Sequence, residues 1–157
     1  MSSPSVIPLA TEPVLGPEAL RSLRALVGLM IPASAQYQVP GADDERIFAD
    51  IVATLRPHAA LARDAIARLD ELAGGSFAAC DGPARQAAAQ DFRTGARALA
   101  SLLVSVTVQC YYRDDRVMVS LGMEPRPPFP KGFEVEQGDW SLLDPVRARP
   151  KMYRPAP

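Results

Sequence analysis

The segment FRTGARALASLLVSVTVQC, residues 92–110, decides the fold class of this chain of 157 residues. Within it, residues 104–108 (VSVTV) alternate with a period of two and are rich in β-branched side chains, which is typical of a strand. The same segment also has apolar side chains at helical spacing. These are Phe92, Ala96, Leu99, Leu102, Leu103, Val106 and Cys110. Because a lone strand would have no pairing partner in an otherwise helical chain, we predict a long helix here and an all-α fold.

The segments on either side carry helix signals of their own. Pro17 suits the first position of a helix, and Pro32 ends that helix because the residue before proline avoids the helical conformation. Asp43 or Asp44 can cap a second helix, and a third runs over roughly residues 58–73. A short alanine-rich segment begins at residue 82, and Asp114 can cap a short helix over residues 115–121. The predicted core contains Leu23, Val27, Ile51, Leu69, Leu99, Leu103 and Val106.

The prolines divide the chain into parts. Of the 16 prolines, eight lie in residues 125–157, where they prevent a continuous helix. We therefore expect an irregular N-terminal arm (residues 1–16), a compact bundle of five to six helices (17–122) and an irregular, proline-rich C-terminal arm (123–157). Residues 145–157 carry Arg147, Arg149, Lys151 and Arg154 and no acidic side chain, so the end of this arm is basic.

Composition excludes several classes of function. The 17 basic and 18 acidic side chains leave a formal charge of -1, which argues against nucleic-acid binding because phosphate contacts need a basic surface. With His58 as the single histidine, a metal site built on imidazoles is not expected. Cys80 and Cys110 are too few for a disulfide framework, and the sequence leaves open whether they pair. Glycine-rich phosphate loops and CxxCH haem sites are missing, so we expect no cofactor and no catalytic residue in this chain.

The expected location is the cytoplasm rather than the periplasm. No basic residue precedes Arg21, and no twin-arginine pair of an export signal is present. The longest uncharged apolar stretch, residues 98–112, is shorter than the roughly 20 apolar residues needed to cross a bilayer. We therefore expect no direct insertion into a membrane.

Large aromatic side chains near the C-terminus are the candidates for binding a protein partner. Aromatic groups on a stiff, proline-rich segment suit docking into grooves, since proline lowers the entropy lost on ordering. The alternative is an arm that covers its own helices. The candidate partner-binding residues are Tyr111, Tyr112, Arg113, Asp114, Phe129, Lys131, Phe133, Trp140 and Tyr153.

Two motifs resemble the gluconate 2-dehydrogenase small-subunit family. Residues 30–33 (MIPA) and 40–42 (PGA) resemble its "IPA…PGA" signature. Residues 111–117 (YYRDDRV), 121–122 (LG) and 127–133 (PPFPKGF) resemble its second signature, "YYTDPRV…LGY…PPPKGY". Within these motifs, the residues expected to have a structural role are Pro32, Pro40, Gly41 and Gly122. Asp115 replaces the usual proline, and the twin-arginine signal common in the family is missing.

This resemblance implies a non-catalytic small subunit that binds and stabilises a large, FAD-dependent oxidoreductase subunit of the glucose-methanol-choline type. In that family FAD is bound by the large subunit, which oxidises a sugar or another alcohol and can pass electrons to a cytochrome. Two alternatives remain open. One is a transient maturation chaperone for that flavoprotein, and the other is a stand-alone helical enzyme that uses Tyr111, Tyr112 and Asp114.

Overall fold

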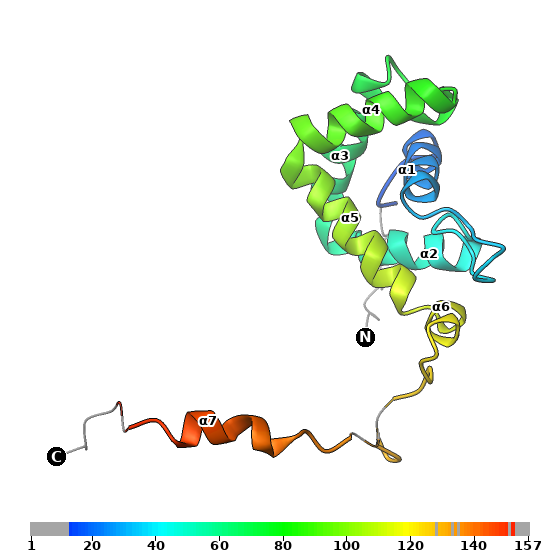
Figure 1. The fold of residues 1–157 in the computed structure, drawn as a ribbon. Helices are drawn as coiled ribbons and strands as arrows, with labels where there is room; N and C mark the ends of the chain where they lie inside the picture. The colour runs from blue at the N-terminus through cyan, green and yellow to red at the C-terminus, as the bar shows by residue number, and fades with distance from the viewer. Residues whose placement is uncertain (1–12, 128, 133, 135, 151, 153–157) are drawn as a thin grey trace, which may run out of the picture. The chain divides into compact units, whose positions relative to one another are not determined.

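The computed structural model describes residues 13–127, 129–132, 134, 136–150 and 152 of the chain. It divides into two compact units, one up to residue 125 and one from residue 126 onward, called here the helical unit and the C-terminal unit. The described residues form seven α-helices and no strand, which confirms the predicted all-α class (Figure 1). The segment 104–108, with its strand-like alternation, is helical.

The helical unit contains six α-helices. These are α1 (Pro17–Met30), α2 (Glu45–Thr54), α3 (Ala59–Leu72), α4 (Gly82–Gly95), α5 (Arg97–Tyr112) and α6 (Asp115–Ser120). Two 3₁₀ turns, η1 (Arg56–His58) and η2 (Phe77–Ala79), flank α3. Helix α5 packs against α2, α3 and α4, and it leads from the end of α4 to the start of α6 (Figure 1).

Helix starts follow the predicted capping residues. Asp44 accepts hydrogen bonds from the backbone nitrogens of Arg46 and Ile47 at the start of α2. Asp114 accepts one from the backbone nitrogen of Arg116, at 3.0 Å, at the start of α6. Gly122 adopts φ +74°, a left-handed conformation that suits glycine, and the chain leaves α6 there.

The boundary between α4 and α5 differs from the sequence prediction. Phe92 was expected on the long fifth helix, but it lies in α4, which has 14 residues and is not the short segment expected. The helix breaks at Ala96, which has φ −126° and ψ 48°. Thr94 and Gly95, which are poor helix formers, precede this break, and no proline marks it.

The core is close to the one expected. Leu23, Val27, Ile51, Leu69, Leu103 and Val106 are buried, as predicted. Leu99 is only partly buried and packs at the edge of the core. Phe77 and Phe92 are the largest of the fully buried side chains. Val14 and Leu15, which lie in the expected N-terminal arm, are also buried, and Arg63 Nε donates to the carbonyl of Val14.

The C-terminal unit has short helices where an irregular arm was expected. The 3₁₀ helix η3 (Trp140–Leu143) continues into α7 (Asp144–Arg147). Asp139 caps η3 by accepting a hydrogen bond from the backbone nitrogen of Ser141. Pro145 fits because it occupies the first turn of α7, where a backbone N–H has no partner in the helix. Among the described residues of the whole chain, no helix is long and apolar enough to span a bilayer.

Candidate functional site

The first motif and residues 111–117 of the second motif meet in the helical unit, whereas the last part of the second motif belongs to the C-terminal unit. Tyr111, in the last turn of α5, is buried, and its hydroxyl donates to the carbonyl oxygen of Pro40 at 3.2 Å. Tyr112 packs edge-on against it, with the ring centroids 5.3 Å apart, and is itself exposed. Residues 71 positions apart in the sequence therefore form one side of the site.

The loop between α1 and α2 holds Pro40 in place by close backbone contacts. The backbone nitrogen of Ala42 donates to the carbonyl of Ile31, the residue before Pro32, at 2.9 Å. A Cβ atom at Gly41 would lie 2.9 Å from the backbone nitrogen of Ala33, so only glycine fits there. Pro32 and Gly41 thus set the course of the loop that receives Tyr111.

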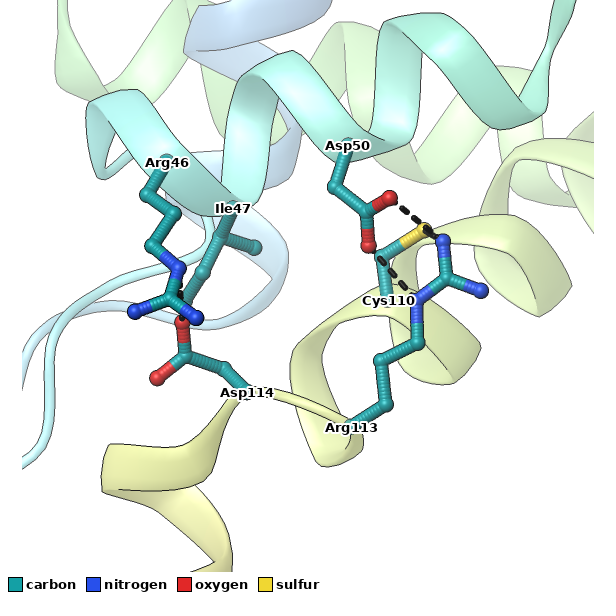
Figure 2. A pocket seen from close by; sticks show the side chains of 6 residues that line it. All are labelled: Arg46, Ile47, Asp50, Cys110, Arg113 and Asp114. Atoms are coloured by element: carbon teal, nitrogen blue, oxygen red, sulfur yellow. Dashed lines mark hydrogen bonds and ion pairs between the residues drawn. The ribbon is translucent and has the colours of Figure 1, made fainter.

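Arg113 joins the end of α5 to α2. Its Nε donates to one carboxylate oxygen of Asp50 at 2.6 Å and its Nη2 to the other at 2.5 Å. Nη2 also donates to the hydroxyl of Thr54 at 2.9 Å. Such a bidentate pair fixes both side chains, because the planar guanidinium matches the carboxylate (Figure 2).

Arg116 joins α6 to the start of α2. Its guanidinium donates to Asp114 at 2.9 Å through Nε and to Asp44 at 2.7 Å through Nη2. Arg46 lies 3.9 Å from the buried carboxylate of Asp114. Two residues that cap helices, 70 positions apart in the sequence, are thereby linked through a single arginine.

Several of these side chains line a pocket of about 460 Å³ (Figure 2). The residues lining it are Arg46, Ile47, Asp50, Cys110, Arg113 and Asp114. Its walls come from α2 on one side and from the junction of α5 and α6 on the other. The pocket combines two of the predicted site residues, Arg113 and Asp114, with four that were not predicted.

The ion pairs keep the carboxylates of the site charged. Hydrogen bonds from Arg116 hold the pKa of Asp44 and that of Asp114 below their usual range. Hydrogen bonds from Arg113 lower the pKa of Asp50 in the same way. The pKa of Arg116 is raised by its hydrogen bonds to Asp114 and Asp44. At neutral pH the network therefore consists of fully ionised pairs.

The thiol in the pocket is in its protonated form at neutral pH. Burial raises the pKa of Cys110 above its usual value. Its sulfur contacts the hydroxyl of Thr54 at 3.5 Å. Cys80 and Cys110 are both free thiols, so they do not pair. A raised pKa makes a thiol a weak nucleophile, since the thiolate is the reactive form.

The geometry suits holding helices together better than it suits proton transfer. A general acid or base works best with a pKa near the working pH, whereas the pKa values of Asp44, Asp50 and Asp114 are shifted away from it. Each carboxylate already binds an arginine. Within the described ranges, no group of three or more His, Cys, Asp or Glu side chains is placed to hold a metal ion.

The predicted residues of the C-terminal arm lie in the C-terminal unit. Phe129 and Trp140 are exposed, by 83% and 59% of their surface, and Lys131 is exposed as well. Phe133 and Tyr153 lie outside the described residues. The structure thus brings Tyr111, Arg113 and Asp114 together with the loop at Pro40 in the helical unit, while Phe129 and Trp140 belong to the C-terminal unit.

Sequence reasoning missed Asp44, Asp50, Arg46 and Arg116 as members of the site. Asp44 was interpreted only as a helix cap, whereas Arg113 and Asp114 were predicted as partner-binding residues without their ion-pair partners. One signal was present, because each of the two helix starts carries side chains that complement the charges of the other. Spacing along the chain could not show that the two starts lie side by side.

We find no match to this chain among protein-family models, among curated proteins or among solved structures. The functional interpretation therefore depends on the two sequence motifs, on the site geometry and on the exposed surfaces of the chain itself.

Proposed function

We propose that this chain is a non-catalytic small subunit that binds and stabilises a large FAD-dependent sugar or alcohol oxidoreductase. FAD would be bound by the large subunit, and a cytochrome is a possible electron acceptor of the complex. The proposal starts from the resemblance of two motifs to the gluconate 2-dehydrogenase small-subunit family.

The contact between Tyr111 and Pro40 is the observation that carries the proposal. Each motif alone is short, and the first one contains no group with obvious chemistry. Their convergence gives both motifs a common structural role, since the first forms the loop that accepts the tyrosine of the second. A family that retains this pair of motifs would retain the same junction of α5, α6 and the α1–α2 loop.

The chemistry of the pocket supports a structural role for the junction. Asp50 and Asp114 are each bound by an arginine and are ionised, and Cys110 is a protonated thiol. None of these groups is poised to take up or release a proton near neutral pH. A partner subunit would supply the flavin chemistry.

Exposed apolar side chains in the C-terminal unit support partner binding. Its described large apolar residues are all exposed, with none in the core. They are Phe129, Trp140, Leu142, Leu143, Val146 and Met152. Exposed aromatic and aliphatic groups of this kind are typical anchors of protein interfaces. The basic residues Arg147 and Arg149 beside them would favour an acidic partner surface.

The test is co-purification of the tagged full-length chain from its native host. A stable, stoichiometric complex with a much larger chain and the absorption spectrum of a flavin is the expected result. If this chain is bound to the flavoprotein only during maturation and is absent from the active enzyme, the chaperone function is favoured instead. Turnover of an alcohol substrate by the purified chain alone would contradict the proposal. Fractionation of the host cells tests the expected cytoplasmic location in the same experiment.

Variants of the C-terminal unit locate the docking surface. Trp140→Ala should weaken binding of the large subunit by about 2 kcal/mol, because an aromatic side chain that becomes buried in the interface would lose its contacts with the partner. Arg149→Ala serves as the control, since charges at the rim of an interface change mainly the association rate and the salt dependence. Full retention of the large subunit after removal of residues 126–157 would place the docking surface on the helical unit.

A further inference from the structure

A second apolar surface lies on the helical unit, away from the residues of the Arg113 pocket. It is a groove of about 360 Å³ formed by α1, α4 and α5. The buried side chains of Leu26, Phe92 and Ala100 contribute to its lining. Leu29 from α1 and Val104 from α5 also line it, and they are 36% and 41% exposed. Apolar walls left in water are unfavourable and would gain stability from a cover.

One edge of this groove is polar and positively charged. Gln86, Gln90 and Arg93 of α4 line it together with the apolar residues. A second hollow of about 280 Å³ shares Arg93, Ala100 and Val104 with the groove and adds Arg97. The two hollows therefore adjoin at the junction of α4 and α5.

The two arginines at this edge have no ion pair within the described part of the chain. Arg93 and Arg97 are both exposed, and neither takes part in the ion pairs found among the described residues. Arg97 is the first residue of α5, where a positive charge is unfavourable to the helix dipole. No acidic residue in the first turn offsets this charge. Helix stability therefore does not account for an arginine at this position.

We propose that this groove binds an amphipathic α-helix of a protein partner, with its apolar stripe against Leu29 and Val104 and at least two carboxylates facing Arg93 and Arg97. Helices bind in such grooves through apolar residues at positions i, i+3 or i+4, and i+7. Because the charge lies at one edge only, the acidic residues should flank the apolar stripe on one side. That the helix belongs to the large subunit rests on the function proposed above.

The first experiment identifies the occupant by cross-linking. In one variant of the full-length chain, expressed in its native host, a photo-reactive amino acid replaces Val104. In a second variant of the same chain, it replaces Leu61. Leu61 is the matched control, since it is an apolar and exposed residue on α3 that does not line the groove. The expected product is an adduct from position 104 only, and its partner peptide has apolar residues at helical spacing and two or more acidic residues.

The second experiment tests the charges. The double variant Arg93→Glu, Arg97→Glu should lower the yield of the adduct at position 104 at least tenfold, because like charges then face each other. Arg56→Glu should leave the yield unchanged, since Arg56 is also exposed but lies outside the groove. An acid at position 97 favours the helix dipole, so the double variant should fold. Circular dichroism of the purified variant checks this.

The outcomes separate this proposal from the proposed function. An adduct with an acidic amphipathic helix of the flavin-containing large chain supports both. The same kind of helix from another protein supports the groove proposal, and the proposed function is then decided by the co-purification experiment alone. A flavoprotein that co-purifies without an adduct, or an adduct unaffected by the double variant, overturns the groove proposal and leaves the function in place. Adducts with lipid, with a second copy of this chain or with a peptide that lacks acidic residues overturn it as well.

Discussion

The helical unit and the C-terminal unit carry the same kinds of side chain in opposite environments. In the helical unit, Phe77 and Phe92 are fully buried among helices. In the C-terminal unit, Phe129 and Trp140 are exposed to solvent. Aromatic residues therefore stabilise the fold in one unit, whereas in the other they remain available for contacts with another molecule.

Hydrogen bonding shows the same difference. In the helical unit, side chains bond to groups far along the chain, as from Ser22 to Asp70 and from Arg116 to Asp44. In the C-terminal unit, Arg126 donates to the carbonyl of Gly132, six positions away, and Arg147 donates to Asp144, three positions away. Contacts between residues far apart in the chain therefore hold the first unit together, whereas these bonds of the second unit are local. Five predictions test this difference, in order of decreasing effect on stability.

The largest effect is expected in the core of the helical unit. Phe92→Ala should lower the free energy of unfolding by about 3–5 kcal/mol, because it removes a large buried side chain and leaves a cavity. Urea denaturation of the full chain, followed by circular dichroism, measures it. Phe129→Ala is the matched control and should change the value by less than about 0.5 kcal/mol. Equal losses at the two positions would contradict the comparison.

The next effect concerns the buried carboxylate that joins α6 to α2. Asp114→Asn should cost about 2 kcal/mol, because the side chain can still cap α6 but loses its charged hydrogen bonds with Arg116. The same denaturation experiment measures the loss. Asp115→Asn, at an exposed neighbour, is the control and should have a small effect. A wild-type value for the Asp114 variant would mean that the ion pairs do not support the junction.

Lowering the pH should weaken the same junction. The pKa values of Asp44, Asp50 and Asp114 are lower in the folded chain than the usual value of about 3.9. Their contribution is therefore complete above about pH 4 and is lost as the pH falls through the lower folded-state values. The melting temperature, measured at intervals below pH 5, should decrease, and it should decrease less steeply in the Asp114→Asn variant. Parallel curves for the two proteins would refute this.

A smaller effect is expected where the two motifs meet. Tyr111→Phe should lower the free energy of unfolding by about 1 kcal/mol, since the ring stays buried while the carbonyl of Pro40 loses its hydrogen bond. Tyr112→Phe is the control, because the neighbouring ring is exposed. Denaturation curves measure the free energy of unfolding of the two variants. A larger loss of this free energy for Tyr112→Phe than for Tyr111→Phe would contradict the assigned roles.

The smallest effect on stability is expected at Trp140. Trp140→Ala should change the free energy of unfolding of the helical unit by less than about 0.5 kcal/mol, since it removes an exposed side chain from the other unit. Its effect should instead be on binding to the large subunit. A marked loss of stability would mean that the C-terminal unit contributes to the core, and the comparison of the two units would fail.

Features set by local chemistry could be predicted from the sequence. Pro32 ends α1, and Asp44 and Asp114 cap α2 and α6, because each effect involves residues within one helical turn. The alternation at residues 104–108 did not mislead, since the surrounding helical pattern is longer. Thr107 fits into this helix because its hydroxyl donates to the carbonyl of Leu103 at 2.7 Å.

Features that depend on tertiary packing could not be predicted from the sequence. The helix break at Ala96 has no proline to mark it, so Phe92 was placed on the wrong helix. Leu99 has the spacing of a core residue but lies at the edge of the core, where the position of the neighbouring helix decides its exposure. The ion pairs between Arg116 and Asp44 and between Arg113 and Asp50 connect residues more than 60 positions apart. Neither charge pattern alone reveals its partner.

Trp140 is the single tryptophan of the chain, and it is exposed in the C-terminal unit. Excitation of the indole therefore gives an optical signal from this unit alone. Unfolding of the helical unit should leave the fluorescence emission almost unchanged, whereas a partner that covers the ring should shift the emission to shorter wavelength. The protein thus contains its own reporter for association, and this reporter does not respond to the stability of the core.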